Sequence, residues 1–116
     1  MTVLRVVPVL TVADLDTAVA EHTRILGLTE VMNHGWIATL ADADHSRQLS
    51  LMTTDQTAQL NPSVSVEVDD VDAAYAEASA AGLQIVHPLT DEPWGVRRFF
   101  FADASGNVVN VLSHRD

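Results

Sequence analysis

The sequence predicts an α+β fold of two tandem βαβββ modules, with cupped, mostly antiparallel sheets and the helices on the outside. An internal repeat is the main observation: residues 12–21 (VADLDTAVAE) reappear in altered form as residues 68–77 (VDDVDAAYAE). Each copy follows a short apolar run and ends at a glycine followed by leucine, at Gly27 and Gly82. Because each copy spans about half the chain, the repeat indicates a duplicated module and not a solenoid.

The first module is expected to begin with a strand over residues 3–10, which are rich in β-branched residues. The helix that follows has an apolar stripe at three- and four-residue spacing. Its members are Leu15, Ala18, Val19, His22, Ile25 and Leu26. Asp14 is placed to cap the first turn, and Gly27 suits the left-handed position after the last turn. Short apolar runs at 28–32, 36–40 and 48–52 predict three further strands.

The second module repeats this plan after a strand over residues 63–68. Asp70 is the expected helix cap, and Gly82 follows the last turn. The inward residues of this helix are Val71, Ala74, Tyr75, Ala78 and Ala81. Strands are expected over 84–89, 96–102 and 108–112, with a tight turn at the DASGN segment, residues 103–107.

A length of 116 residues is that of a single domain, here divided into module one (about 1–54), a linker (about 55–61) and module two (about 62–116). Arginines and acidic residues give a net charge of −10, which argues against nucleic acid and anionic membranes as partners. The absence of cysteine excludes disulfides, thiolate metal sites and cysteine nucleophiles. No apolar run is long enough to span a membrane and the N-terminus lacks the pattern of a signal peptide, so we expect a cytoplasmic protein.

Three segments carry a resemblance to a known family: VPVLTVADL at 7–15, EPWGVR at 92–97 and DASGN at 103–107. Together with the tandem modules, they resemble the vicinal-oxygen-chelate superfamily, which includes glyoxalase I, extradiol dioxygenases, and fosfomycin- and bleomycin-resistance proteins. The PVLT opening and the PWG segment look most like the bleomycin-resistance proteins. The resemblance covers nearly the whole chain and implies the cupped sheets of this superfamily.

The metalloenzymes of that superfamily hold a metal ion with His, Gln or Glu side chains from four strands. The repeat aligns these positions with Val7, Ser50, Ser63 and Asn110, none of which is a histidine or a glutamate. Valine and serine do not replace imidazole or carboxylate ligands. The sequence therefore predicts no metal and no other cofactor, and it argues against glyoxalase, extradiol-cleaving and fosfomycin-opening activities.

Other residues with catalytic potential favour structural roles. His22 lies on the apolar stripe of its helix, and no two histidines have the four-residue spacing of a helical zinc site. Ser105 lies in the DASGN turn and not in a nucleophile elbow. General acid–base catalysis by a buried carboxyl group stays open, because a sequence does not show a perturbed pKa.

Aromatic side chains are the remaining candidates for a binding site. Trp36 and Trp94 lie beside glycine, where a ring often forms a partly exposed platform that stacks planar groups and attracts cations. Of three consecutive phenylalanines, Phe99 and Phe101 face one side of the expected strand and Phe100 faces the other.

Bleomycin-resistance proteins bind their cationic, planar-tailed ligand in a groove shared by two subunits. The resemblance therefore implies a homodimer and a set of groove-lining positions, namely Trp36, Trp94, Phe101, Val7, Ser50, Ser63 and Asn110. We predict a metal-independent binding protein that sequesters a small aromatic or cationic compound. The alternative is an enzyme of the same superfamily, of lyase, isomerase or dioxygenase type, that uses a relocated metal or metal-free acid–base chemistry.

Overall fold

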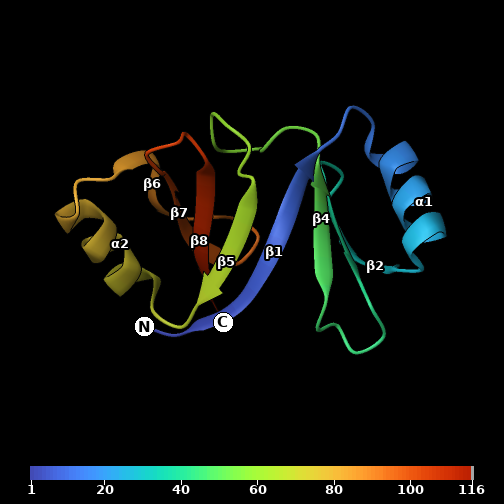
Figure 1. Ribbon diagram of the computed structural model, residues 1–116, viewed down its shortest axis with the longest axis horizontal. Coiled ribbons are helices and arrows are strands. Elements are labelled where there is room, and N and C mark those ends of the chain that lie inside the picture. The colour runs from blue at the N-terminus through green and yellow to red at the C-terminus, as the bar shows by residue number, and fades with distance from the viewer. Residues whose placement is uncertain (116) are drawn as a thin grey trace. The chain divides into compact units, whose positions relative to one another are not determined.

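The computed structural model describes residues 1–115, which divide into two compact units. One unit comprises residues 7–61, and the other comprises residues 1–6 together with residues 62 onward. The predicted α+β class is confirmed, because the described residues form βαβββ in each half of the chain (Figure 1). Residues 1–6, which the sequence repeat assigns to module one, belong to the second compact unit.

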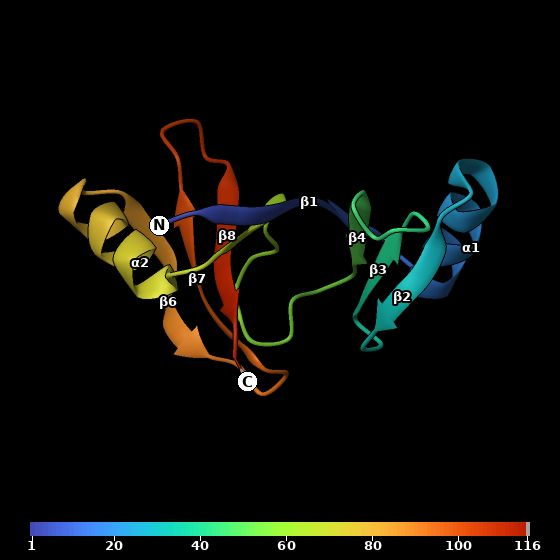
Figure 2. The same ribbon diagram turned by 90° about the horizontal axis from the view of Figure 1, so that it is seen from below.

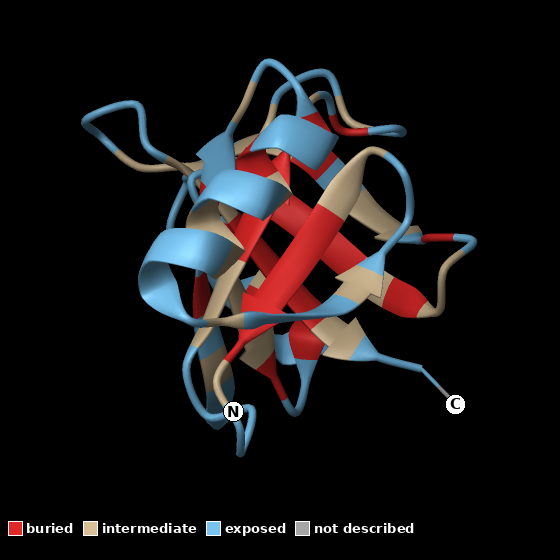
Figure 3. Cartoon of the chain, turned by 90° about the vertical axis from the view of Figure 1, so that its right-hand side faces the viewer, coloured by how far each residue is buried: buried red, intermediate tan, exposed pale blue. Residues whose placement is uncertain are grey.

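The unit of residues 7–61 places one helix on a four-stranded sheet. Its elements are β1 (Val3–Thr11, of which the first residues belong to the other unit), α1 (Leu15–Leu26), β2 (Thr29–Asn33), β3 (Ile37–Ala41) and β4 (Gln48–Met52). The strands lie in the order β2-β3-β4-β1, with β1 and β4 parallel and the other pairs antiparallel. Leu15 and Ala18 of α1 pack against buried residues of β3 and β4. Figure 3 shows buried residues concentrated on the strands, while the outward side of the helix nearest the viewer is exposed.

The unit that begins at residue 62 repeats this plan. Its elements are β5 (Val64–Val68), α2 (Val71–Ala80), β6 (Gln84–Asp91), β7 (Val96–Ala102) and β8 (Val108–His114), seen from below in Figure 2. The strands lie in the order β5-β8-β7-β6, and only the β5–β8 pair is parallel. The first residues of β1 lie beside the end of β5, where the Asp69 amide donates a hydrogen bond to the Thr2 carbonyl at 3.1 Å.

The predicted helix boundaries are confirmed. The Asp14 carboxylate accepts a hydrogen bond from the Thr17 amide at 2.9 Å, and Gly27 ends α1 with a φ of 68°. The Asp70 carboxylate caps α2 in the same way. The expected apolar stripe of α1 is buried only in its first half: Ile25 is 78% exposed, because only the first turns of the helix rest on the sheet.

Strands β6 and β8 run two residues further than the sequence indicates. Asp91 of β6 pairs with Arg97 of β7, and His114 of β8 pairs with Val96. These polar residues have a low propensity for strands, but their pairing with β7 keeps them in the extended conformation. Among the described residues, neither helix is long and apolar enough to cross a membrane.

Candidate functional site

A helix covers one face of each sheet and leaves the other face helix-free. Because side chains alternate along a strand, neighbouring residues lie on opposite faces. The predicted lining residues divide between the two units: Val7, Trp36 and Ser50 lie in one, and Ser63, Trp94, Phe101 and Asn110 lie in the other. We describe the two sets separately.

In the unit of residues 7–61, the predicted residues are already partnered or apolar. Val7 is 4% exposed on β1. The Ser50 hydroxyl on β4 shares a hydrogen bond of 2.8 Å with the Thr39 hydroxyl on β3, and both residues are buried. Trp36 is half-buried just before β3, where its carbonyl accepts a hydrogen bond from the Thr53 amide at 3.0 Å.

In the other unit, Asn110 is the polar centre of the helix-free face. It lies on β8 between Ser65 of β5 and Phe100 of β7, its partners in the two strand ladders. The amide nitrogen of Asn110 donates to the Ser65 hydroxyl at 3.0 Å. Asn110 is 6% exposed, and its buried carbonyl oxygen Oδ1 has no hydrogen-bond partner. A buried acceptor without a partner is rare and costly.

Beside Asn110, an arginine is held between aromatic rings. The guanidinium carbon of Arg98 lies 4.9 Å from the Trp94 ring centre and 4.7 Å from that of Phe100. The Arg98 Nε atom donates to the Glu92 carboxylate at 2.5 Å, and the same carboxylate oxygen lies 3.3 Å from His87 Nε2. Of the two rings, Phe100 is fully buried and Trp94 is half-buried, so Trp94 is the one that leaves aromatic surface exposed beside the cluster.

Phe101 lies apart from this cluster. It packs with Phe99 in the core on the α2 side, and the two ring centres are 6.3 Å apart. Phe100, its neighbour, lies on the helix-free face with Arg98. The predicted alternation of the three phenylalanines is therefore confirmed. Ser63, just before β5, is exposed and donates its backbone N–H to the Val108 carbonyl.

Sequence reasoning missed Arg98, Glu92, His87 and Ser65. The available signal was the position in the strand, because side chains two residues apart lie on the same face. Ser65 lies two residues after Ser63, a predicted site residue, and Arg98 lies two residues before Phe100. Glu92 carried no such signal, because the pairing with Arg98 depends on the hairpin between β6 and β7.

The residues that the sequence repeat aligns with metal-ligand positions do not fit a catalytic metal ion. Val7 has no donor atom, the Ser50 hydroxyl is bonded to Thr39, and Asn110 offers only one neutral amide oxygen. Divalent transition metals in such sites are held by imidazole and carboxylate ligands. Within residues 1–115, no group of three or more His, Asp or Glu side chains has metal-binding geometry.

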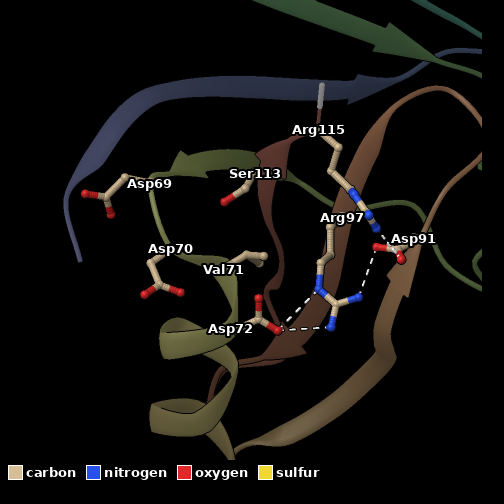
Figure 4. Close-up of a pocket in the computed structure, with 8 residues that line it drawn as sticks. All are labelled: Asp69, Asp70, Val71, Asp72, Asp91, Arg97, Ser113 and Arg115. Atoms are coloured by element: carbon tan, nitrogen blue, oxygen red, sulfur yellow. Dashed lines mark hydrogen bonds and ion pairs between the residues drawn. The ribbon is translucent and has the colours of Figure 1, made fainter.

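A polar hollow of about 430 Å³ lies at the start of α2, on the unit that begins at residue 62. Figure 4 shows Arg97 between Asp72 and Asp91, with Arg115 reaching Asp91 from the other side. Hydrogen bonds from Arg115 and then Arg97 hold the pKa of Asp91 below its ordinary value. The two guanidinium groups of the hollow thus pair with Asp72 and Asp91, in an ion-pair network that ties α2 to the strand ends.

The fold and the site define a duplicated βαβββ protein in which the uncharged residue Asn110 lies at the centre of one helix-free face. The chain belongs to the Glyoxalase/Bleomycin resistance protein/Dioxygenase superfamily, whose sequence model matches residues 3–111. No curated protein matches the chain.

Solved structures share this fold at low sequence identity. A superfamily member from Vibrio splendidus 12B01 has a TM-score of 0.71 and 19% identity, covering 97% of this chain and 99% of that one. A protein described as an NAD-dependent benzaldehyde dehydrogenase from Legionella pneumophila has a TM-score of 0.76 and 14% identity, with 95% and 99% covered. A hypothetical protein from Bacillus halodurans C-125 has a TM-score of 0.75 and 12% identity, with 100% and 97% covered. At these identities the likeness establishes the fold alone.

Proposed function

We propose that this chain is a metal-independent binding protein that sequesters a small planar or cationic molecule at the helix-free face of the β5–β8 sheet. The unpartnered carbonyl oxygen of Asn110 is the observation that carries the proposal. Leaving a buried acceptor unpaired costs about 1–3 kcal/mol. A ligand that donates a hydrogen bond to this oxygen recovers that free energy. An asparagine whose side-chain groups were all paired within the protein would give a ligand no such gain.

The surroundings of Asn110 indicate the chemistry of the ligand. An acceptor requires a donor, such as the N–H of an ammonium, amidinium or amide group. The half-buried ring of Trp94 supplies a flat surface against which a planar group packs. The net charge of −10 raises the local concentration of cations around the protein.

Thermal unfolding followed by circular dichroism tests this proposal. Acriflavine and pentamidine, which are cations with aromatic rings and N–H donors, serve as probes, and parallel samples contain Zn²⁺, Ni²⁺, Mn²⁺ or Fe²⁺. A ligand at one hundred times its dissociation constant adds about 2.7 kcal/mol to the free energy of unfolding. We expect stabilisation by a cationic probe and none by the metals.

Two variants connect the effect to the site. Asn110→Leu removes the acceptor and is expected to abolish the stabilisation. Gln84→Leu, which removes a side-chain amide from an exposed residue of β6, is the matched control and should retain it. Stabilisation by a metal ion alone would contradict the proposal and favour the metalloenzyme alternative. The expected homodimer and the cytoplasmic compartment are part of the proposal, and sedimentation velocity tests the first of them.

A further inference from the structure

An apolar hollow lies between α2 and the strands of the β5-β8-β7-β6 sheet, on the side opposite the Asn110 face. It has a volume of about 400 Å³ and is lined almost entirely by apolar atoms. We call it the α2 groove. Its helix wall is formed by Ala74, Ala78 and Ala81, and its strand wall by Phe99, Phe101 and valines of β1, β5 and β8. All of these residues belong to the unit that begins at residue 62, with residues 1–6.

The groove follows from the residue sizes on α2. Ala74 and Ala78 face the sheet and the exposed Ala81 follows the last turn, so these positions supply no long side chain to fill the space above the strands. Tyr75, the large residue of the helix, instead packs edge-on against Phe99, with ring centres 5.0 Å apart.

The mouth of the groove is open to solvent. Val3 is 51% exposed and Leu83 is 39% exposed, and both line it. Apolar residues that line an open concave surface of this volume are typical of a small-molecule site.

One charged side chain lines the groove. Glu77 is exposed on α2, and its carboxylate makes no hydrogen bond or ion pair within the described residues. Most other carboxylates of this unit are engaged, as Asp72 and Asp91 are with Arg97. An apolar wall with one free anion at its edge is complementary to an apolar molecule that carries a single positive charge.

We propose that the α2 groove binds small apolar cations, such as aliphatic or polycyclic amines. The ring or chain occupies the space between the alanines and Phe99, and the ammonium group lies beside Glu77. This site is separate from the Asn110 face, because Val109 and Val111 line the groove while Asn110 points to the other side of β8.

Amide proton–nitrogen NMR titration tests the proposal with three compounds that share one apolar body. Adamantylammonium, adamantanol and adamantanecarboxylate carry a cationic, a neutral and an anionic polar group on this body. We expect adamantylammonium to shift amide signals of α2 and β5 saturably, and to bind about tenfold or more tightly than the carboxylate, a difference of about 1.4 kcal/mol. The side-chain amide signals of Asn110 report the other face and separate this result from the function proposed above.

Two pairs of variants assign the binding to the groove. Ala81→Leu places a side chain in it and should weaken adamantylammonium binding about tenfold or more, whereas Ala80→Leu, an exposed neighbour that does not line it, should not. Glu77→Gln should weaken binding about two- to fivefold, as expected for an exposed ion pair, while Glu30→Gln in the other unit should leave it unchanged.

Several results would overturn the proposal. One is equal binding of adamantanecarboxylate and adamantylammonium, and another is equal weakening by Ala80→Leu and Ala81→Leu. A third is a dimer that Ala81→Leu dissociates, combined with no binding of any adamantane compound, which would make the groove an interface between two copies of the chain.

Discussion

Arg98 and Glu92 form a buried ion pair in which the Nε atom of the arginine lies 2.5 Å from a carboxylate oxygen of the glutamate. The two side chains are 3% and 2% exposed. Trp94 and Phe100 enclose the guanidinium group, and His87 approaches the same carboxylate oxygen. A buried ion pair adds little to the free energy of unfolding compared with apolar residues of the same shape. Removing one partner is costly, however, because the other charge then stays buried without compensation.

We expect Glu92→Ala to destabilise the protein by about 3–5 kcal/mol, since it removes the carboxylate from a buried guanidinium group. Urea unfolding measures this change in the free energy of unfolding. Glu77→Ala is the control, because its carboxylate is exposed and without a partner, and it should have little effect. A loss of less than about 1 kcal/mol for Glu92→Ala, the range of a surface pair, would contradict the buried pair.

The double variant Ser65→Ala and Asn110→Leu is expected to leave the free energy of unfolding within about 1 kcal/mol of the wild type, or to raise it. It replaces both partners of one hydrogen bond and also removes the buried unpaired oxygen of Asn110. Asn110→Leu alone should be less stable than the double variant, because it leaves the Ser65 hydroxyl without this partner. Urea unfolding of the three proteins checks the order. A double variant less stable than Asn110→Leu would contradict the prediction and show that the Ser65 hydroxyl stabilises the fold through contacts other than its bond to Asn110.

Much of the fold could be predicted from the sequence because local signals agree with the global arrangement. Asp14 and Gly27 mark the two ends of α1, and both take the predicted cap geometry. The pairing of β7 with its neighbours also follows the predicted alternation, with Phe99 and Phe100 on opposite faces. Each of these features depends on residues close together in the chain.

The candidate site was harder to predict because it depends on which face of a strand the helix covers. Alternation groups Phe99 with Phe101, but it does not say that α2 covers this pair and leaves Phe100 with Arg98. The ion pair between Arg98 and Glu92 requires the β6–β7 hairpin to bring the two residues together. Nothing in the sequence around Arg98 or Glu92 distinguishes them from the charged residues that lie on the surface.

Gly27→Ala is expected to destabilise the protein by about 1 kcal/mol, because residue 27 ends α1 in the left-handed region at a φ of 68°. A methyl group there meets no atom within 4 Å, so the cost comes from backbone conformation and not from a clash. Gly27→Asn should cost less, since asparagine tolerates this region better than alanine. Thermal unfolding of both variants checks the order, and equal stability of Gly27→Ala and wild type would contradict the left-handed cap.

Acid should remove the contribution that Asp42 makes to stability. Hydrogen bonds from the Arg47 amide and guanidinium lower the pKa of Asp42 from 3.8 to about 2. Because the folded state favours the ionised carboxyl group, this contribution is complete above the ordinary pKa of 3.8 and is lost as the pH falls towards about 2.

The comparison of wild type with Asp42→Asn isolates this effect. Asparagine still offers an oxygen to the Arg47 amide but carries no charge, so the variant should be less stable than wild type at neutral pH. The difference in unfolding temperature should shrink as the pH falls below 3.8 and vanish near the folded pKa of about 2. Glu30→Asn, at an exposed residue of the same unit, controls for the loss of one negative charge. A difference that stays constant across this pH range would show that the charge of Asp42 does not stabilise the turn.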